Sequence, residues 1–336
     1  MGCTVYNKIM KRKLTPNIIL NKIKFGWNLG NYFDSHDKKF RWETSKSKTV
    51  EYVVNLWHNP VFNFECFDAL KNCNINCVRI PITWCNFIDI EKNDIRVSNE
   101  FIEYLKELID EAFKRDFVVI INMHHDDETW LNVSCSHNEF VRVRKRFKNL
   151  WKAIAFIFKD YNENLIFEGM NEIIDRSNPD KYDWIGEDKR CFKRLNLLYR
   201  IFVKAVRRFS KNNKQRTLII STYGAQIHKN AIANFKMPKD SNLVVDLHFY
   251  SKSTDEEYYE ERFKYVKQFF IEKGIPVIVG EIGVKKDCEN TLDVLKVYVD
   301  YMKKLNLKCV LWDNGKSRKF IDRENGCLVE EVKSIF

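Results

Sequence analysis

Two glutamates, Glu172 and Glu281, stand where a charged side chain is unusual. Each comes at or just after the end of a short apolar run, in the segments LIFEGMNE and VGEIG. A single glutamate is usually solvated or salt-bridged, but two carboxyl groups that face one another across a cleft are what cleavage of a glycosidic bond requires. We interpret Glu172 as the acid/base that gives a proton to the departing sugar oxygen, and Glu281 as the ionised nucleophile.

Polar side chains that suit such a reaction follow other apolar runs. Arg79 and Tyr250 offer a cation and a phenol donor, which would stabilise the negative charge of Glu281. Asn171 precedes Glu172 and can donate a hydrogen bond to a sugar 2-hydroxyl group, although asparagine is also common in turns. These residue types together indicate a site that handles a sugar and a developing charge.

Histidines and tryptophans extend this set. His124 and His248 can orient Arg79 and the carboxylates through ring N–H bonds, with satisfied buried histidines as the alternative interpretation. Trp312 offers a flat apolar face on which a pyranose ring can stack. Trp42 and Trp130 are further candidates for sugar subsites, although large aromatic side chains usually belong to the core.

Eight short runs rich in β-branched residues recur along the chain, each followed by an amphipathic segment long enough for a helix. Polar or aromatic candidates stand at the ends of seven of the eight. The predicted strands are Lys22–Leu29, Asn76–Ile80, Phe117–Asn122, Asn164–Glu168, Thr217–Ser221, Leu243–Leu247, Val277–Gly280 and Lys308–Leu311. Several are apolar without alternation, as expected of parallel strands buried on both faces. Segments such as Phe101–Phe113 and Leu195–Phe209 space their apolar residues as helices do.

The repeated strand and helix, without a Gly- or Pro-rich linker, predict a single α/β unit, a (β/α)8 (TIM) barrel whose active site lies at the carboxyl ends of the strands. A doubly wound sheet would normally carry a Gly-rich phosphate loop in its first βα turn. No such motif occurs, so we expect no nucleotide cofactor. We assign residues 1–20 to an N-terminal extension and residues 21–336 to the catalytic domain. Asn314, three residues after the last predicted strand, is a further candidate at this rim.

Composition argues against other classes of protein. The formal charge is +11 and the pI about 9.0, but the basic residues are scattered and no nucleic-acid motif accompanies them, so we expect no nucleic-acid partner. The ten cysteines contain no C-x-x-C pair, which indicates reduced core thiols and no metal site. Neither a membrane span nor a signal peptide is recognisable. We expect a monomer, cytoplasmic as the chain is written and secreted if a leader has been removed.

As a set, these residues resemble glycoside hydrolase family 5, the large cellulase family of retaining (β/α)8 enzymes. The matching motifs are GWNLGN at Gly26–Asn31, VRIPITW at Val78–Trp84, INMHH at Ile121–His125, LIFEGMNE at Leu165–Glu172, HFY at His248–Tyr250, VGEIG at Val279–Gly283 and LWDNG at Leu311–Gly315. Their order and spacing agree over most of the chain.

The resemblance assigns roles residue by residue. The positions that fall on the family's active site are Arg79, His124, Asn171, Glu172, His248, Tyr250, Glu281 and Trp312. Asn28 and His125 match residues that line its sugar subsites. The chain departs from the family pattern at Ile173, where proline is usual, and at Tyr32 and Phe33, where small residues are usual. These departures affect the loop that carries the acid and a loop expected to face the sugar.

The endoglucanase branch of the family has segments like GWNLGN and WDNG, so a β-1,4-linked glucan is the favoured substrate. Mixed-linkage glucan, xyloglucan and β-mannan stay open, because loop shape at the cleft ends decides between them. For a retaining mechanism we expect the two catalytic carboxyl groups about 5–5.5 Å apart.

Two rival interpretations come from other classes of function. In a metal-dependent hydrolase on the same fold, His124, His125 and Asp126 would be candidate ligands. Adjacent side chains on a strand point to opposite faces, however, so we expect the two histidines not to bind one ion. A catalytically inactive, glycan-binding barrel would lack a carboxylate, and both Glu172 and Glu281 are present.

Overall fold

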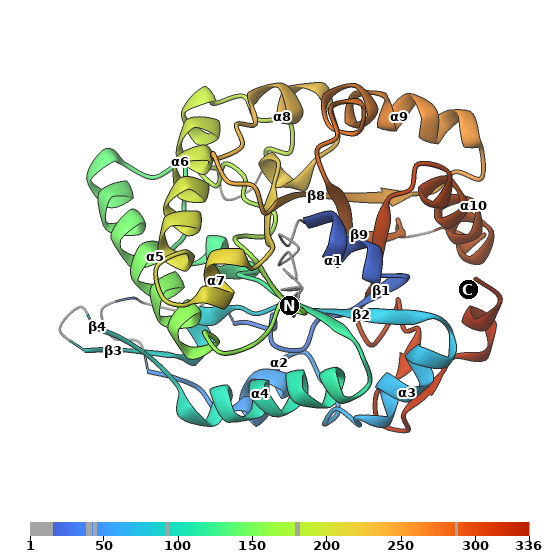
Figure 1. Ribbon diagram of the computed structural model, residues 1–336, viewed down its shortest axis with the longest axis horizontal. Coiled ribbons are helices and arrows are strands. Elements are labelled where there is room, and N and C mark those ends of the chain that lie inside the picture. The colour runs from blue at the N-terminus through green and yellow to red at the C-terminus, as the bar shows by residue number, and fades with distance from the viewer. Residues whose placement is uncertain are drawn as a thin grey trace, which may run out of the picture.

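Eight parallel strands close into a barrel in the computed structural model, which describes residues 16–37, 42, 46–91, 94–178, 182–285 and 288–335 (Figure 1). Around the barrel the strand order is β1-β10-β9-β8-β7-β6-β5-β2. Their bounds are β1 Phe25–Leu29, β2 Ile75–Ile80, β5 Val118–Ile121, β6 Leu165–Glu168, β7 Leu218–Ser221, β8 Leu243–Ser251, β9 Val277–Val284 and β10 Lys308–Asp313. Each overlaps one predicted strand, and the predicted (β/α)8 barrel is confirmed.

Helices surround this barrel. The α-helices are α1 Pro16–Lys22, α2 Val50–Leu56, α3 Glu65–Asn72, α4 Asn99–Lys114, α5 His137–Ile157, α6 Lys189–Val206, α7 Lys211–Gln215, α8 Lys229–Asn234, α9 Glu256–Phe269 and α10 Thr291–Lys304. The short 3-10 helices are η2 Trp84–Phe87, η3 His125–Glu128, η4 Tyr223–Ala225, η5 Ile271–Lys273 and η6 Glu330–Ile335. Helices α4 and α5 begin where the hydroxyl groups of Ser98 and Ser136 accept backbone N–H groups of the first turn.

Two small antiparallel hairpins were not expected from the sequence. One joins β3 Ile88–Glu91 to β4 Asp94–Val97, and the other joins β11 Ile321–Asp322 to β12 Cys327–Leu328. Both follow barrel strands, β2 and β10. They extend the loops on the rim where the carboxyl ends of those strands lie.

The inside of the barrel is filled by apolar side chains from its strands, as in other barrels of this type. They form one cluster with three residues of α1, namely Ile19, Leu20 and Ile23. The strand residues of the cluster are Cys77, Val118, Ile120, Ile166, Ile219, Val244, Ile278 and Val310. Helix α1 therefore covers the barrel interior, and Figure 1 shows it lying across the middle of the ring.

The predicted boundary between an extension and a catalytic domain, at residues 20 and 21, falls inside α1. Because Ile19 and Leu20 are buried against the barrel, this part of the predicted extension packs with the barrel. Residues 1–15 lie outside the described part of the chain. No helix among the described residues is both long and apolar enough to cross a membrane.

Candidate active site

Arg79, near the end of β2, is the centre of the polar network inside the rim. Its Nε and Nη2 groups each donate to an oxygen of Glu168 at 2.7 Å. Nη1 donates at 2.9 Å to Asn28 Oδ1 and to Glu281 Oε1, and Nη2 donates at 2.8 Å to Asn171 Oδ1. A guanidinium group has five N–H donors, so every one of them has an acceptor. The fully buried cation is thus fixed in one orientation.

Glu281 lies on β9, with its carboxyl group held at both oxygens. Arg79 donates to Oε1, and the Tyr250 hydroxyl group on β8 donates to Oε2 at 2.6 Å. Burial raises the pKa of the Glu281 carboxyl, while the positive charges of His248 and Arg79 act in the opposite direction. Burial and the negative charge of Glu281 keep the pKa of Tyr250 well above its usual range, so this phenol stays a donor.

His248 connects the second glutamate to the network. Its Nδ1 atom lies 2.7 Å from Glu172 Oε1, and its Nε2 atom lies 3.1 Å from Asp246 Oδ2. Burial lowers the pKa of His248, but the carboxylates of Glu281 and Asp246 outweigh it and raise the pKa well above the usual range. His248 is therefore a cation that donates both ring N–H groups to carboxylates.

The two glutamates differ in exposure and lie close together. The side chain of Glu172 is 25% exposed, whereas that of Glu281 is 5% exposed. One carboxylate oxygen of each, together with a ring nitrogen of His248, lies within 4.8 Å of the others. This upper limit for two oxygen atoms agrees with the about 5–5.5 Å between the carboxyl groups of retaining enzymes, which is shorter than the about 6.5–9.5 Å of inverting ones.

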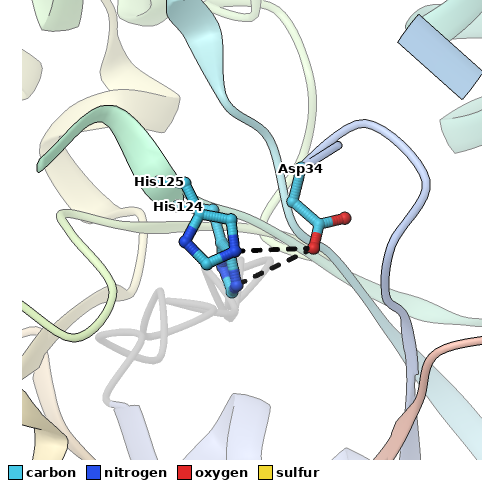
Figure 2. Close-up of side chains that lie close together, drawn as sticks. All are labelled: Asp34, His124 and His125. Carbon is cyan, nitrogen blue, oxygen red and sulfur yellow. Dashed lines mark ion pairs between the residues drawn. The ribbon is translucent and has the colours of Figure 1, made fainter. Parts of the chain in front are cut away.

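A second group of polar side chains contains Asp34, His124 and His125 (Figure 2). The Nε2 atoms of the two histidines lie 3.9 and 4.0 Å from Asp34 Oδ2. The expectation that His124 and His125 point to opposite faces is therefore wrong. Strand β5 has already ended at Ile121, and His125 begins the 3-10 helix η3, so the alternation of an extended strand does not apply.

Asp34 is buried and only partly satisfied. Its Oδ1 atom accepts the backbone N–H of Tyr32, but Oδ2 has no hydrogen-bond partner among the residues that the structure describes. Burial raises the pKa of Asp34 to about 7. An unsatisfied buried oxygen beside two imidazole rings is suited to a ligand that brings its own hydroxyl group.

The geometry alone would also allow a metal ion at either group of side chains, but the proton positions argue against one. Burial and nearby positive charges lower the pKa of His124 well below its usual range, so its ring is neutral. Asn122 accepts the Ile82 N–H through Oδ1, so its Nδ2 donates to His124 Nδ1 at 3.0 Å. Asn171 accepts from Arg79 through Oδ1, so its Nδ2 likewise faces His124 Nε2, at 3.3 Å. Amide donors thus meet both ring nitrogens of His124, and a metal ion at Nε2 would have to displace the Asn171 amide. His248 carries hydrogens on both nitrogens, and a metal ligand needs a free lone pair.

A third group that is close enough for an ion contains Asp175 and Asp188, from the loop between β6 and α6, and Cys191 in the first turn of α6. Burial raises the pKa of the Cys191 thiol to about 12. A thiol binds metal as the thiolate, so this group is also poorly suited to an ion.

Other predicted site residues have supporting roles. Asn28 is fully buried and donates to the Gly280 carbonyl at 2.9 Å while it accepts from Arg79, so it positions the network instead of lining a subsite. Asn314 accepts the Arg318 N–H and donates to Ser317 within its own loop, which identifies it as a turn residue.

The predicted aromatic residues divide into two kinds. Trp312 lies parallel to the His124 ring, with centroids 5.7 Å apart. Gly30 permits this position, because a Cβ atom there would lie 2.8 Å from the indole ring. Trp42 and Trp130 are buried and pack on each other at 4.9 Å, which supports the core interpretation for both.

The departures from the family pattern at Tyr32 and Phe33 do not face a sugar. Both side chains are buried, the Tyr32 hydroxyl group lies 3.1 Å from that of Tyr104, and Phe33 packs edge-on against Phe101. The expectation of a sugar-facing loop at these two side chains is wrong. They enlarge the core instead. Ile173 is also fully buried.

Four important polar residues were not singled out from the sequence: Asp34, Asn122, Glu168 and Asp246. Glu168 and Asp246 stand inside the apolar runs of β6 and β8. A charged side chain in a strand buried on both faces must be paired, because an unpaired buried charge is costly. The sequence therefore indicates that Glu168 and Asp246 are paired, but it does not identify their partners, Arg79 and His248.

Comparisons with known proteins agree with this geometry. The family profile Cellulase (glycosyl hydrolase family 5) matches residues 33–318. Endoglucanase A of Clostridium longisporum is 28% identical over 316 residues, which are 88% of this chain. The chain spans 59% of the length of that relative.

Solved structures give the same result. A broad-specificity endoglucanase from Ruminococcus champanellensis with bound cellotriose has a TM-score of 0.87 and 26% identity, covering 96% of this chain and 98% of that one. A xyloglucan-specific endo-β-1,4-glucanase from a metagenomic library, in complex with cellotriose, has a TM-score of 0.84 and 27% identity, covering 95% and 97%. Both likenesses extend over the whole barrel.

Proposed function

Because the chain belongs to glycosyl hydrolase family 5, the cellulase family, we propose that it cleaves β-1,4-linked glucan chains internally with retention of configuration. The prediction of a cellulase-type glycoside hydrolase is confirmed at the level of the family. The mechanistic proposal rests on the pair Glu172 and Glu281. A carboxylate oxygen of one lies within 4.8 Å of a carboxylate oxygen of the other, and the Glu172 side chain is more exposed than that of Glu281.

The first half of the reaction uses both glutamates at once. Glu172 gives a proton to the glycosidic oxygen as its bond to the anomeric carbon breaks, and Glu281 attacks that carbon to form a glycosyl ester. Arg79 and Tyr250 hold the attacking carboxylate in place, so little reorganisation is needed at the moment of attack. His248 holds one oxygen of Glu172, which leaves the other to carry the proton.

The second half reverses these roles. Glu172, now ionised, takes a proton from a water molecule, and the resulting hydroxide attacks the anomeric carbon while the bond to Glu281 breaks. Two displacements restore the original configuration. The cation on His248 stabilises Glu172 while it is ionised, because the two groups are 2.7 Å apart.

Substrate recognition is proposed for the second polar group. A sugar hydroxyl group placed about 2.8 Å from Asp34 Oδ2 and from both histidine Nε2 atoms would satisfy the unpartnered oxygen. Trp312, beside His124, would offer its apolar face to the same pyranose ring. Cellotriose is bound by two of the similar structures, and one of them is specific for xyloglucan, so xyloglucan is the second candidate substrate. We also propose that the enzyme acts as a monomer.

Reducing-sugar release from cellulose derivatives, mixed-linkage glucan, xyloglucan and mannan tests this proposal. Glu281→Gln should reduce turnover at least a thousandfold while substrate still binds, because a nucleophile acts in chemistry more than in ground-state binding. Glu261→Gln, an exposed ion-paired glutamate on α9, is the matched control and should keep full activity. Proton NMR of the first product should show the β-anomer. An α-anomer would rule out retention, and a folded protein inactive on every glycan would favour a binding role.

A further inference from the structure

A cavity of about 660 Å³ lies between the outer face of α6 and the segment 234–239 that leads from α8 towards β8. Its floor is apolar, formed by Phe192 and Val203 of the helix and by Met237 and Pro238 of the segment. Ligand cavities in proteins are commonly of this size and are mostly apolar with a few polar groups at the edge. Figure 1 shows α6 on the outside of the barrel.

The edge of this cavity carries six exposed cations and no acidic residue. They are Lys189, Lys193, Arg200, Lys204, Lys236 and Lys239. No ion pair involves any of the six in the described parts of the chain, although many other surface cations of this protein are paired. The two aspartates that flank the lining residues are already engaged: Asp188 by Arg190 at 2.8 Å and Asp240 by Arg207 at 2.8 Å.

The cavity walls are tied together before any ligand arrives. Asn196, buried in the middle of the α6 face, donates to the Asn234 carbonyl and accepts the Lys236 N–H, both at 2.9 Å. A preformed cavity avoids the cost of ordering its walls on binding. Six like charges around one cavity also repel each other in the free protein, and an anionic ligand would relieve that repulsion.

The arrangement of the charges indicates an elongated ligand. Lys189 and Lys204 are separated along α6 by about 22 Å, at 1.5 Å per residue. One compact anion cannot span that length, whereas an extended peptide of about seven residues can. A single-stranded nucleic acid would need aromatic faces for its bases, and the one aromatic side chain of the lining, Phe192, is buried. A neutral glucan offers no charge for the six cations.

We propose that this cavity binds an extended acidic peptide segment that inserts an aliphatic side chain between α6 and residues 234–239. Carboxylates of the peptide pair with the lysines and Arg200 on both walls, and its apolar side chain fills the space over Met237. The site is separate from the catalytic cleft, so binding leaves glucan hydrolysis possible.

Fluorescence anisotropy with the full chain tests the proposal. The probe is a fluorescein-labelled heptapeptide of alternating glutamate and leucine, and the comparison peptides replace glutamate by glutamine or leucine by serine. We expect the glutamate–leucine peptide to bind at least tenfold more tightly than either comparison peptide, and more weakly at 200 mM than at 50 mM salt because screening weakens the charge pairs. Equal binding of the three peptides, or no binding, would overturn the proposal.

Variants locate the binding. Lys193→Glu with Arg200→Glu on one wall, and Lys236→Glu with Lys239→Glu on the other, should each weaken peptide binding at least tenfold. The matched control is Lys145→Glu with Lys148→Glu on α5, which makes the same charge change on exposed residues outside the cavity and should weaken binding less than threefold. An equal loss in all three double variants would show attraction to net charge alone and refute the site. Tighter binding of a single-stranded oligonucleotide than of the peptide would refute the acidic-peptide assignment.

Discussion

Replacement of Glu168 by glutamine tests whether the buried charge network holds both the fold and the nucleophile. Glu168 receives two of the five donors of Arg79 and one from Asn122 Nδ2. Glutamine has the same shape, but its oxygen can take only one of the two carboxylate positions, and its NH2 group at the other position would face an N–H group of Arg79. One guanidinium N–H loses its acceptor, and the Arg79 charge retains only Glu281 as a directly bonded carboxylate.

The expected cost is large because neither partner is exposed to water. Removal of one member of a buried ion pair typically costs about 3–5 kcal/mol, whereas an exposed pair contributes about 0–1 kcal/mol. Glu168→Gln should therefore lower the free energy of unfolding by about 3 kcal/mol or more. Arg79 also positions Glu281, and a misplacement of about 1 Å can reduce turnover about a hundredfold. We expect kcat to fall between tenfold and a hundredfold with a smaller change in KM.

Urea unfolding followed by tryptophan fluorescence measures the first quantity, and initial rates on a soluble glucan measure the second. Glu261→Gln, which breaks the exposed pair with Lys264, is the control and should change the free energy of unfolding by less than about 0.5 kcal/mol. If Glu168→Gln unfolds at the same urea concentration as the control, the inference that the buried Arg79 needs Glu168 as its partner is refuted. If stability falls but kcat does not, Arg79 does not position the nucleophile.

Two further predictions concern single groups of the site. Tyr250→Phe removes a donor to Glu281 Oε2, and a hydrogen bond to a charged group contributes about 1.5–3 kcal/mol, so we expect kcat to fall about tenfold to a hundredfold. Because this bond lowers the pKa of Glu281, its loss should move the acidic limb of the kcat/KM profile to higher pH, and an unmoved limb would contradict this role. Burial raises the pKa of Asp34 to about 7, so the folded protein keeps a proton there that the unfolded chain releases above about pH 4. As the pH rises from about 4 to 7, this group should therefore lower the stability of the wild-type protein by up to about 4 kcal/mol. Asp34→Asn should remove that loss, which thermal unfolding at pH 4.5 and pH 8 of both proteins would detect; parallel changes in the two proteins would count against a buried acid at this position.

Much of the fold was predictable because its signals are local. Every predicted barrel strand is present, since continuous apolar runs such as Phe117–Asn122 indicate strands buried on both faces. The hairpin formed by β3 and β4 was not predicted, because its short strands, Ile88–Glu91 and Asp94–Val97, lack a long apolar run. The predicted start of the first strand at Lys22 was too early because residues up to Lys22 belong to α1.

The site was predictable to the extent that its residues stand at strand ends. Glu172, Glu281, His248 and Tyr250 were named from their positions, and the structure brings them together. His124 and His125 were misjudged because their relative direction depends on where β5 ends, which the sequence leaves open by a few residues. The donors around His124 were also out of reach, since they are the amides of Asn122 and Asn171, whose orientations depend on the Ile82 backbone and on Arg79.

The members of the Arg79 network explain why the remainder could not be predicted. Its partners come from β1, β6 and β9, between 51 and 202 positions away in the chain. Each polar group alone would be a poor choice for the inside of a barrel, because burying it without a partner is costly. They become favourable only when the strands close and all five donors meet acceptors. Barrel closure and assembly of the nucleophile's surroundings are therefore coupled, so a change that loosens the ring of strands should reduce turnover and stability together.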